Sequence, residues 1–174
     1  MNIDELNAII LNPTENVNTI RGFEIIAEAL VHTIYQVFGK NMSLNILYQI
    51  GAGPAEKIAQ RIKKKYSKEK FKIIEAVRVV FEELKGFFSV QIKSIESDDI
   101  KIKIVLENHC FLREPIKNRD SLDFGKSFCR INKGYFETVF KHLLGEELKN
   151  IEAKFLENDE ENNICIEELI FYLK

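Results

Sequence analysis

The sequence predicts an α+β domain in which N-terminal helices pack on an antiparallel sheet and a long helix lies between two hairpins. Three observations predict this fold. Apolar residues recur at three- and four-residue steps before residue 86, they alternate with polar residues from 88 to 104, and helical spacing returns between 128 and 144. Helices followed by a hairpin, a helix and a second hairpin are typical of helices packed on an antiparallel sheet.

The chain has the length and composition of one domain. It has 174 residues, of which 45% are hydrophobic and 30% are charged, and this suits a single globular core. Residues 1–20 contain Pro13 and a polar stretch, so we expect them to form an N-terminal arm. Residues 21–174 are expected to form the domain itself.

Three helices are expected in the first half of the domain. The first runs from Phe23 to Gly39, and the second from Leu44 to Lys65 with an interruption at Gly51-Ala52-Gly53-Pro54. The third runs from about Glu69 to Leu84, and Gly86 follows where a helix C-terminus favours a positive φ.

The second half is expected to contain two hairpins and one helix. The first hairpin turns at Glu96–Asp99, and a polar loop starting at Glu107 leads to the helix from Phe128 to Leu144, which Gly145 closes. The strands are expected at Phe88–Ile92, Ile100–Ile104, Ile151–Leu156 and Ile164–Leu173.

Charge and hydropathy exclude several partners. Lys and Arg number 25 against 27 Asp and Glu, a net charge of -2, so the charge balance gives no electrostatic footprint for nucleic acid. No apolar run approaches the ~20 residues needed to span a bilayer, and the N-terminus lacks the layout of a signal peptide. We therefore expect a cytoplasmic protein without a nucleic-acid or membrane partner.

The common catalytic and phosphate-binding motifs are absent. Gly51-Ala-Gly53 lacks the third glycine and the preceding strand of a nucleotide loop, so a helix bend or a close helix contact explains it better. Lys63-Lys64-Lys65 ends a helix, where basic residues complement the helix dipole. No Ser, His and Asp arrangement indicates nucleophilic catalysis, and no catalytic residue is assigned.

The three cysteines are the residues most open to a chemical role. Cys110 follows His109 at the end of the second strand, Cys129 lies in the first turns of the long helix, and Cys165 opens the last strand. Zinc accepts thiolate, imidazole and carboxylate ligands that come from distant segments. No Cys-x-x-Cys spacing is present, and buried thiols that act as small hydrophobes remain the alternative.

Several segments resemble the 4-vinyl reductase domain family. They are Glu107–Glu114, Phe128–Phe136 and Cys165, together with Leu47–Gly51 upstream, and the resemblance covers about 21–174. It implies a fold shared with subunits of vesicle-tethering transport particles (TRAPP), which dimerise through helices. It also implies an apolar ligand cavity between helices and sheet.

In relatives that act as sensors of aromatic compounds, a zinc ion lies near the ligand pocket. The ligands that the resemblance assigns to this zinc are Cys129, Glu152 and Cys165. The family's remaining ligand position falls on Phe155, which cannot bind a metal, so Cys110 or His109 would have to supply the missing ligand. A closed set of four ligands would be structural. Glu152 has a plain alternative as an outward carboxylate on a wet strand face.

Aromatic residues are the candidate walls of the ligand cavity, because such cavities are mostly apolar with a few polar groups. The candidates are Tyr48, Phe128, Tyr135, Phe136 and Phe140, with Phe87 and Phe88 as further ones. The hydroxyl groups of Tyr48 and Tyr135 could orient a ligand. Any core would use the same residues.

Three functions remain open. The first is the binding and sensing of a small apolar or aromatic molecule, with zinc as the only expected cofactor. The second is a dimeric assembly subunit of the transport-particle kind, for which apolar residues exposed along Ile25–Phe38 would be the sign. The third, an accessory role in tetrapyrrole vinyl reduction, is the weakest because no nicotinamide, flavin or iron–sulfur fingerprint is present.

Overall fold

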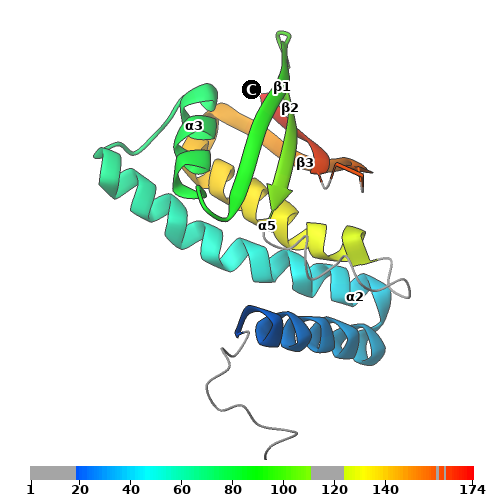
Figure 1. The fold of residues 1–174 in the computed structure, drawn as a ribbon. Coiled ribbons are helices and arrows are strands. Elements are labelled where there is room, and N and C mark those ends of the chain that lie inside the picture. Colours follow the sequence, from blue (N-terminus) through cyan, green and yellow to red (C-terminus); the bar gives the residue numbers. More distant parts are fainter. Residues whose placement is uncertain (1–18, 111–123, 160, 163) are drawn as a thin grey trace, which may run out of the picture.

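The computed structural model describes residues 19–110, 124–159, 161–162 and 164–174 (Figure 1). Of the predicted arm, residues 1–18 lie outside this part of the chain. No helix within the described ranges combines the length and the apolarity that crossing a bilayer requires.

The described elements confirm the predicted α+β class. In chain order they are α2 (Thr19–Tyr66), α3 (Ile73–Glu83), β1 (Phe88–Ser97), β2 (Lys101–Cys110), α5 (Phe124–Leu144), the 3₁₀ turn η1 (Gly145–Glu147), β3 (Leu148–Asp159) and β4 (Ile164–Leu173). The strands form one antiparallel sheet in the order β1-β2-β4-β3, so β1 and β3 are its edges. As expected, α5 connects the two hairpins.

The element α2 consists of two helices that fold back on each other at Gly39. This residue has φ 70° and ψ 173°, a conformation that side chains disfavour, and the first helix was expected to end there. The Ser43 hydroxyl donates a hydrogen bond of 2.6 Å to the Gly39 carbonyl and fixes the turn. In Figure 1 the first helix lies beneath the second. The second helix continues through Pro54, so the expected interruption does not break it.

The second half of α2 and α5 touch backbone to backbone. A Cβ atom on Gly51 would lie 1.9 Å from the Ile131 carbonyl oxygen, and one on Gly134 would lie 2.1 Å from the Tyr48 carbonyl oxygen. Both distances are far below van der Waals contact, so only glycine fits at this crossing. Of the two interpretations of Gly51, the close helix contact is the one that the structure shows.

The core lies between the sheet and the helices, which cover one of its faces. Phe140 and Phe171 meet there edge to face with ring centroids 5.2 Å apart. The largest side chains that are almost fully buried are Phe71, Phe136, Phe140, Phe171, Leu47, Ile62, Ile104, Leu106, Leu143, Leu144 and Leu169. These residues come from every layer, so one continuous core holds the helices on the sheet.

Several element boundaries differ from the expectation, and two of these differences have a clear structural cause. The helix α3 begins at Ile73 rather than Glu69, because the Phe71 amide donates to the Leu143 carbonyl oxygen at 3.1 Å and holds the preceding segment extended against α5. Residues Glu107–Cys110 belong to β2 rather than to a loop, since they pair with β1 as far as Phe88.

Candidate functional site

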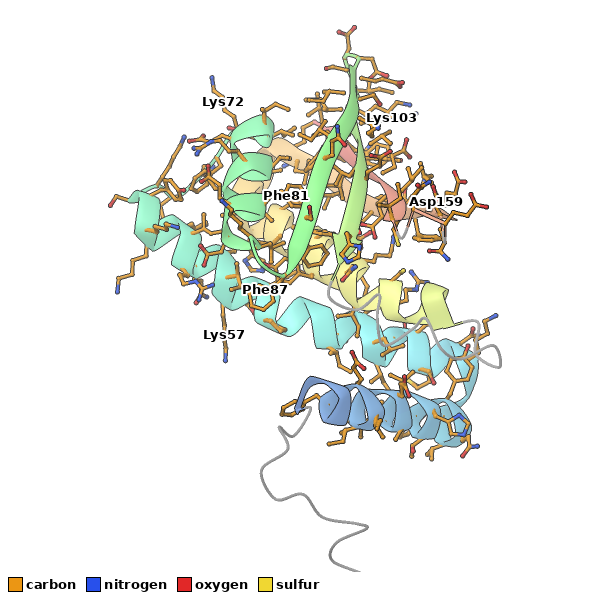
Figure 2. The ribbon with its side chains drawn as sticks, viewed as in Figure 1. Lys57, Lys72, Phe81, Phe87, Lys103 and Asp159 are labelled. Carbon is orange, nitrogen blue, oxygen red and sulfur yellow. The ribbon has the colours of Figure 1, made fainter. Side chains whose placement is uncertain are left out.

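An apolar groove of about 380 Å³ runs between α3 and the edge strand β1. We call it the α3–β1 groove. Its lining residues are Ile74, Val77, Arg78, Phe81 and Glu82 from α3, Lys85 just after it, Val90, Ile92 and Ile95 from β1, and Ile104 from β2. Phe81 lies between α3 and β1 in Figure 2. The volume falls within the ~300–1,000 Å³ of typical ligand sites, near the lower limit.

Helical spacing supplies one wall of the α3–β1 groove. Ile74, Val77 and Phe81 recur at steps of three and four residues and therefore share one face of α3. Val77 is buried, while Ile74 remains 51% exposed because no described element covers it on the open side. The same helix thus joins the core at one side and leaves apolar surface at the other.

A β-bulge builds the other wall. The pairing of β1 with β2 shifts between Ile92 and Ser94, so that Ile92 lies opposite Leu106 and Ile95 lies opposite Ile104. Without the bulge, residues 92 and 95 would face opposite sides of the sheet. The extra residue turns Ile95 to the inner face, where it lines the groove and stays 49% exposed.

The charged side chains of the groove are Arg78 and Glu82 on α3 and Lys85 just after it. Arg78 donates to Glu82 at 2.8 Å, and the Tyr66 hydroxyl donates to the same carboxylate at 2.9 Å. The hydrogen bond from Tyr66, followed by that from Arg78, holds the pKa of Glu82 below its ordinary value. Lys85 forms no ion pair with any described residue, so it is the unneutralised cation of the groove.

The residues predicted to bind ligand lie outside the α3–β1 groove. Phe136 and Phe140 fill the core, and the ring of Phe136 lies 5.7 Å from that of Phe81 and 5.6 Å from that of Phe88. Phe136 therefore stands directly behind the groove lining. Phe87 is exposed, and the side chain of Phe128 is not among those described. A ligand-binding role for these residues stays a prediction.

The two predicted tyrosines differ in their hydrogen bonding. The Tyr48 hydroxyl donates to Glu137 on α5 at 2.9 Å. Burial and then this hydrogen bond raise the pKa of Tyr48. The Tyr135 hydroxyl is buried and has no hydrogen-bond partner among the described residues, and burial raises the pKa of Tyr135 to about 12. Neither side chain lines the α3–β1 groove.

Glu137 also connects α5 to the edge strand β3. Its carboxylate accepts the backbone amide of Ala153 at 3.0 Å, and Lys133 donates to the carbonyl oxygen of the same residue at 2.9 Å. Lys133 and Glu137 pair with each other at 2.7 Å. We call this arrangement the β3 clasp. The sequence offered a faint signal for it, because Lys133 and Glu137 are four residues apart on the predicted helix.

The structure brings two of the predicted metal ligands to the same end of the interface between α5 and the sheet. The Asn132 side chain interacts with Glu167, and Phe140 meets Phe171, so α5 and β4 run in the same direction. Cys129 therefore lies toward Cys165. Cys165 is buried, Cys129 is half-buried, and neither forms a disulfide.

The other predicted metal ligands are placed differently. Glu152 pairs with Ile170, five residues along β4 from Cys165 or about 17 Å at the usual rise per residue. Its carboxylate lies 3.2 Å from Lys154 and accepts the Tyr172 hydroxyl at 3.4 Å. The structure thus does not bring Glu152 to the cysteines.

His109 is exposed opposite Ser89, and the side chain of Cys110 is not described. Within the described ranges no group of three or more His, Cys, Asp and Glu side chains is placed to hold a metal. Zinc binding through Cys129 and Cys165 stays a prediction.

Sequence reasoning missed a buried polar cluster at the same end of the sheet. Asn108, Asn132 and Glu167 are each 5% exposed or less. Burial raises the pKa of Glu167, and the two nearby amides oppose this effect. Within the part of the chain that the structure describes, the Asn108 amide forms no hydrogen bond of normal geometry. The sequence contained one indication of this cluster. Glu167 is a charged residue at an inward-facing position of the strand, between Cys165 and Leu169 in the alternation.

Comparisons with known proteins show the fold. No family model matches the chain, and no curated protein matches it by sequence. Among solved structures it resembles the phenol-responsive sensory domain of the transcription activator PoxR with phenol, at a TM-score of 0.58 and 12% identity over 86% of this chain and 74% of that one.

It also resembles a trafficking protein particle complex subunit 3 from Naegleria fowleri covalently bound to palmitic acid. The TM-score is 0.58 and the identity is 12%, over 90% of this chain and 95% of that one. Both likenesses agree with the fold expected from the resemblance to 4-vinyl reductase domains. Membership of that family itself stays a prediction.

Proposed function

We propose that this chain is a binding module for a small apolar molecule, which the α3–β1 groove holds. The groove itself carries the proposal, because seven of its ten lining residues are apolar and three exposed isoleucines lie on its open side. Exposed apolar surface of this kind usually marks a binding site. Two proteins of similar fold are bound to phenol and to palmitic acid, which are largely apolar molecules.

A ligand in the groove would have a direct route to the core. It would pack on Phe81, whose ring contacts Phe136 on α5 at 5.7 Å. Because protein cores are close-packed, a shift of Phe81 would be felt at Phe136 and along α5. This contact is the physical basis on which binding could be sensed.

A displacement assay tests the proposal. Anilinonaphthalene sulfonate serves as the fluorescent probe, and phenols and fatty acids compete with it. We compare Ile74→Glu, inside the groove, with Leu156→Glu on β3, because both native side chains are 51% exposed. Ile74→Glu should weaken binding about tenfold or more, since the pocket loses apolar contact and gains a charge. Equal weakening in both variants, or no competition by any compound, would refute the proposal.

A second candidate function is helix-mediated assembly, and a specific observation favours it. Phe23, Leu30 and Val37 follow one another at seven-residue steps on the first helix of α2, and all are more than half exposed. Such a stripe fits a second copy of the chain, and we propose a homodimer through these helices.

Light scattering during size-exclusion chromatography tests the dimer. Val37→Glu should convert it to monomer, whereas Ile100→Glu should not, although both native side chains are 65% exposed. A monomeric wild-type protein at high concentration would contradict this proposal and leave ligand binding untouched.

A further inference from the structure

Positive charge is concentrated at one corner of the molecule, where α2 ends and α3 begins. Residues 57–72 contain eight Lys and Arg residues against Glu69 alone, a net charge of +7. Since the whole chain carries -2, the remaining residues carry -9. The near-neutral total therefore conceals a strong separation of charge. We call residues 57–72 the basic corner.

Half of these cations are not neutralised within the structure. Arg61 and Lys65 pair with Glu83, Lys68 pairs with Glu75, and Lys63 pairs with Glu69. The exposed lysines that form no ion pair with described residues are Lys57, Lys64, Lys70 and Lys72. In Figure 2 the labelled side chains of Lys57 and Lys72 extend away from the body of the molecule.

The helix dipole explains only part of this charge. Lys63, Lys64 and Lys65 lie in the last turn of α2, where cations interact favourably with the helix C-terminus. That effect fades within one turn, and Lys57 lies more than two turns before the end of the helix. Lys70 and Lys72 lie beyond the helix. Stabilisation of α2 therefore accounts for Lys64 but not for Lys57, Lys70 and Lys72.

We propose that the basic corner docks the protein on the surface of an anionic lipid bilayer. The free lysines sit on α2, on the segment after it and at the start of α3, and no described pocket includes them. A bilayer suits such an arrangement, because its charge is spread over a surface and requires no matching shape. Ile74, half-exposed two residues after Lys72, adds an apolar contact beside the charges.

This proposal departs from the expectation that net charge alone gave, in which no membrane partner was foreseen. Net charge measures the total, whereas a surface interacts with the charges within a Debye length of it, about 10 Å at 0.1 M salt. Each lysine near an anionic bilayer strengthens binding about fivefold, so a local cluster acts even when the total charge is negative.

Vesicle co-sedimentation of the full chain tests the proposal. The vesicles are pure phosphatidylcholine or phosphatidylcholine with a quarter of phosphatidylglycerol. The test variant is Lys64→Glu with Lys72→Glu, and the control is Lys40→Glu with Lys174→Glu, which changes the net charge equally at exposed sites outside the basic corner. Circular dichroism checks that both variants fold.

We expect binding to the anionic vesicles alone, loss of that binding at 1 M salt, and at least about a 25-fold weaker partition for the test variant, at fivefold per lysine. The control variant should keep most of its binding. Equal loss in both variants would overturn the proposal, because total charge would then explain the effect. So would binding to polyglutamate without binding to anionic vesicles, which would indicate an acidic protein partner instead.

Discussion

Replacing Gly134 by alanine should destabilise the protein through the crossing of α2 and α5. The added Cβ would lie 2.1 Å from the Tyr48 carbonyl oxygen, about 1.3 Å closer than ordinary contact. Neither partner is a side chain that could rotate away, so the helices themselves must separate. A gap of ~0.5–1 Å already forfeits a quarter to a half of the dispersion energy between facing atoms.

The magnitude follows from two opposing effects. Alanine favours the helix by about 1 kcal/mol over glycine. Overpacking costs about 1–3 kcal/mol and more where backbone must move, and the separation of the helices adds lost contact. We therefore expect a net loss of about 2–4 kcal/mol in the free energy of unfolding. Gly22 supplies the control, because it lies in α2 and a Cβ there meets nothing within 4 Å, so Gly22→Ala should stabilise by up to about 1 kcal/mol.

Urea denaturation followed by far-ultraviolet circular dichroism measures both effects. With a slope of about 2–3 kcal/mol per molar urea, Gly134→Ala should lower the midpoint by about 1 M, and Gly22→Ala should raise it slightly. If the two Gly→Ala substitutions shift the urea midpoint in opposite directions, the destabilisation by Gly134→Ala comes from the crossing of α2 and α5. A Gly134→Ala protein as stable as the wild type would refute the close contact on which the reasoning depends.

Three further predictions concern Tyr135, Glu137 and the cysteines. Because the pKa of Tyr135 is raised to about 12, the folded state holds its proton more tightly than the unfolded state, so stability should fall between about pH 10 and 12. Tyr135→Phe should reduce that slope in urea titrations at alkaline pH without destabilising the protein at pH 7, and the remaining slope reflects Tyr48, whose pKa is also raised; an unchanged slope would contradict the assignment. Glu137→Ala leaves the Ala153 amide and the Tyr48 hydroxyl without their acceptor and should cost about 2–4 kcal/mol in urea denaturation. Glu137→Gln, which keeps one acceptor oxygen for one of these two donors, should cost less. If zinc binds through the cysteines, native mass spectrometry with elemental analysis should find one zinc ion per chain, and Cys129→Ser and Cys165→Ser should each lose it. Glu152→Gln should retain the ion, because Glu152 lies far along the sheet from Cys165. A metal-free wild-type protein would indicate that both cysteines are core thiols.

Local patterns were enough to predict the elements of the fold. Gly39 at the turn in α2 and Gly86 after α3 both have a positive φ, a conformation that glycine adopts readily. The alternation of Ile100, Ile102 and Ile104 likewise predicted a strand with one inner face. Each of these signals involves neighbours in sequence, so a single chain is sufficient to read them.

The features that depend on distant residues escaped prediction. The bulge that turns Ile95 inward depends on how β1 aligns with β2, and alternation counted from Val90 and Ile92 places Ile95 on the wrong face. The pairing of Gly51 with Gly134 depends on where two helices cross. The α3–β1 groove could not be predicted for the same reason, because its walls come from α3 and from the bulged strand β1, which lie next to each other only in the folded chain. The aromatic residues predicted to line a ligand cavity lie in the core instead.

The β3 clasp constrains how copies of this protein can associate. Unpaired backbone groups at a sheet edge are the usual template on which another chain adds a strand. At β3 the amide and carbonyl of Ala153 are already engaged by α5. At β1 the bulge and Lys93, which pairs with Glu107 at 2.9 Å, hinder a neighbouring strand. Growth of the sheet from one molecule into the next is thus hindered at both edges, which agrees with the proposal that copies associate through the helices.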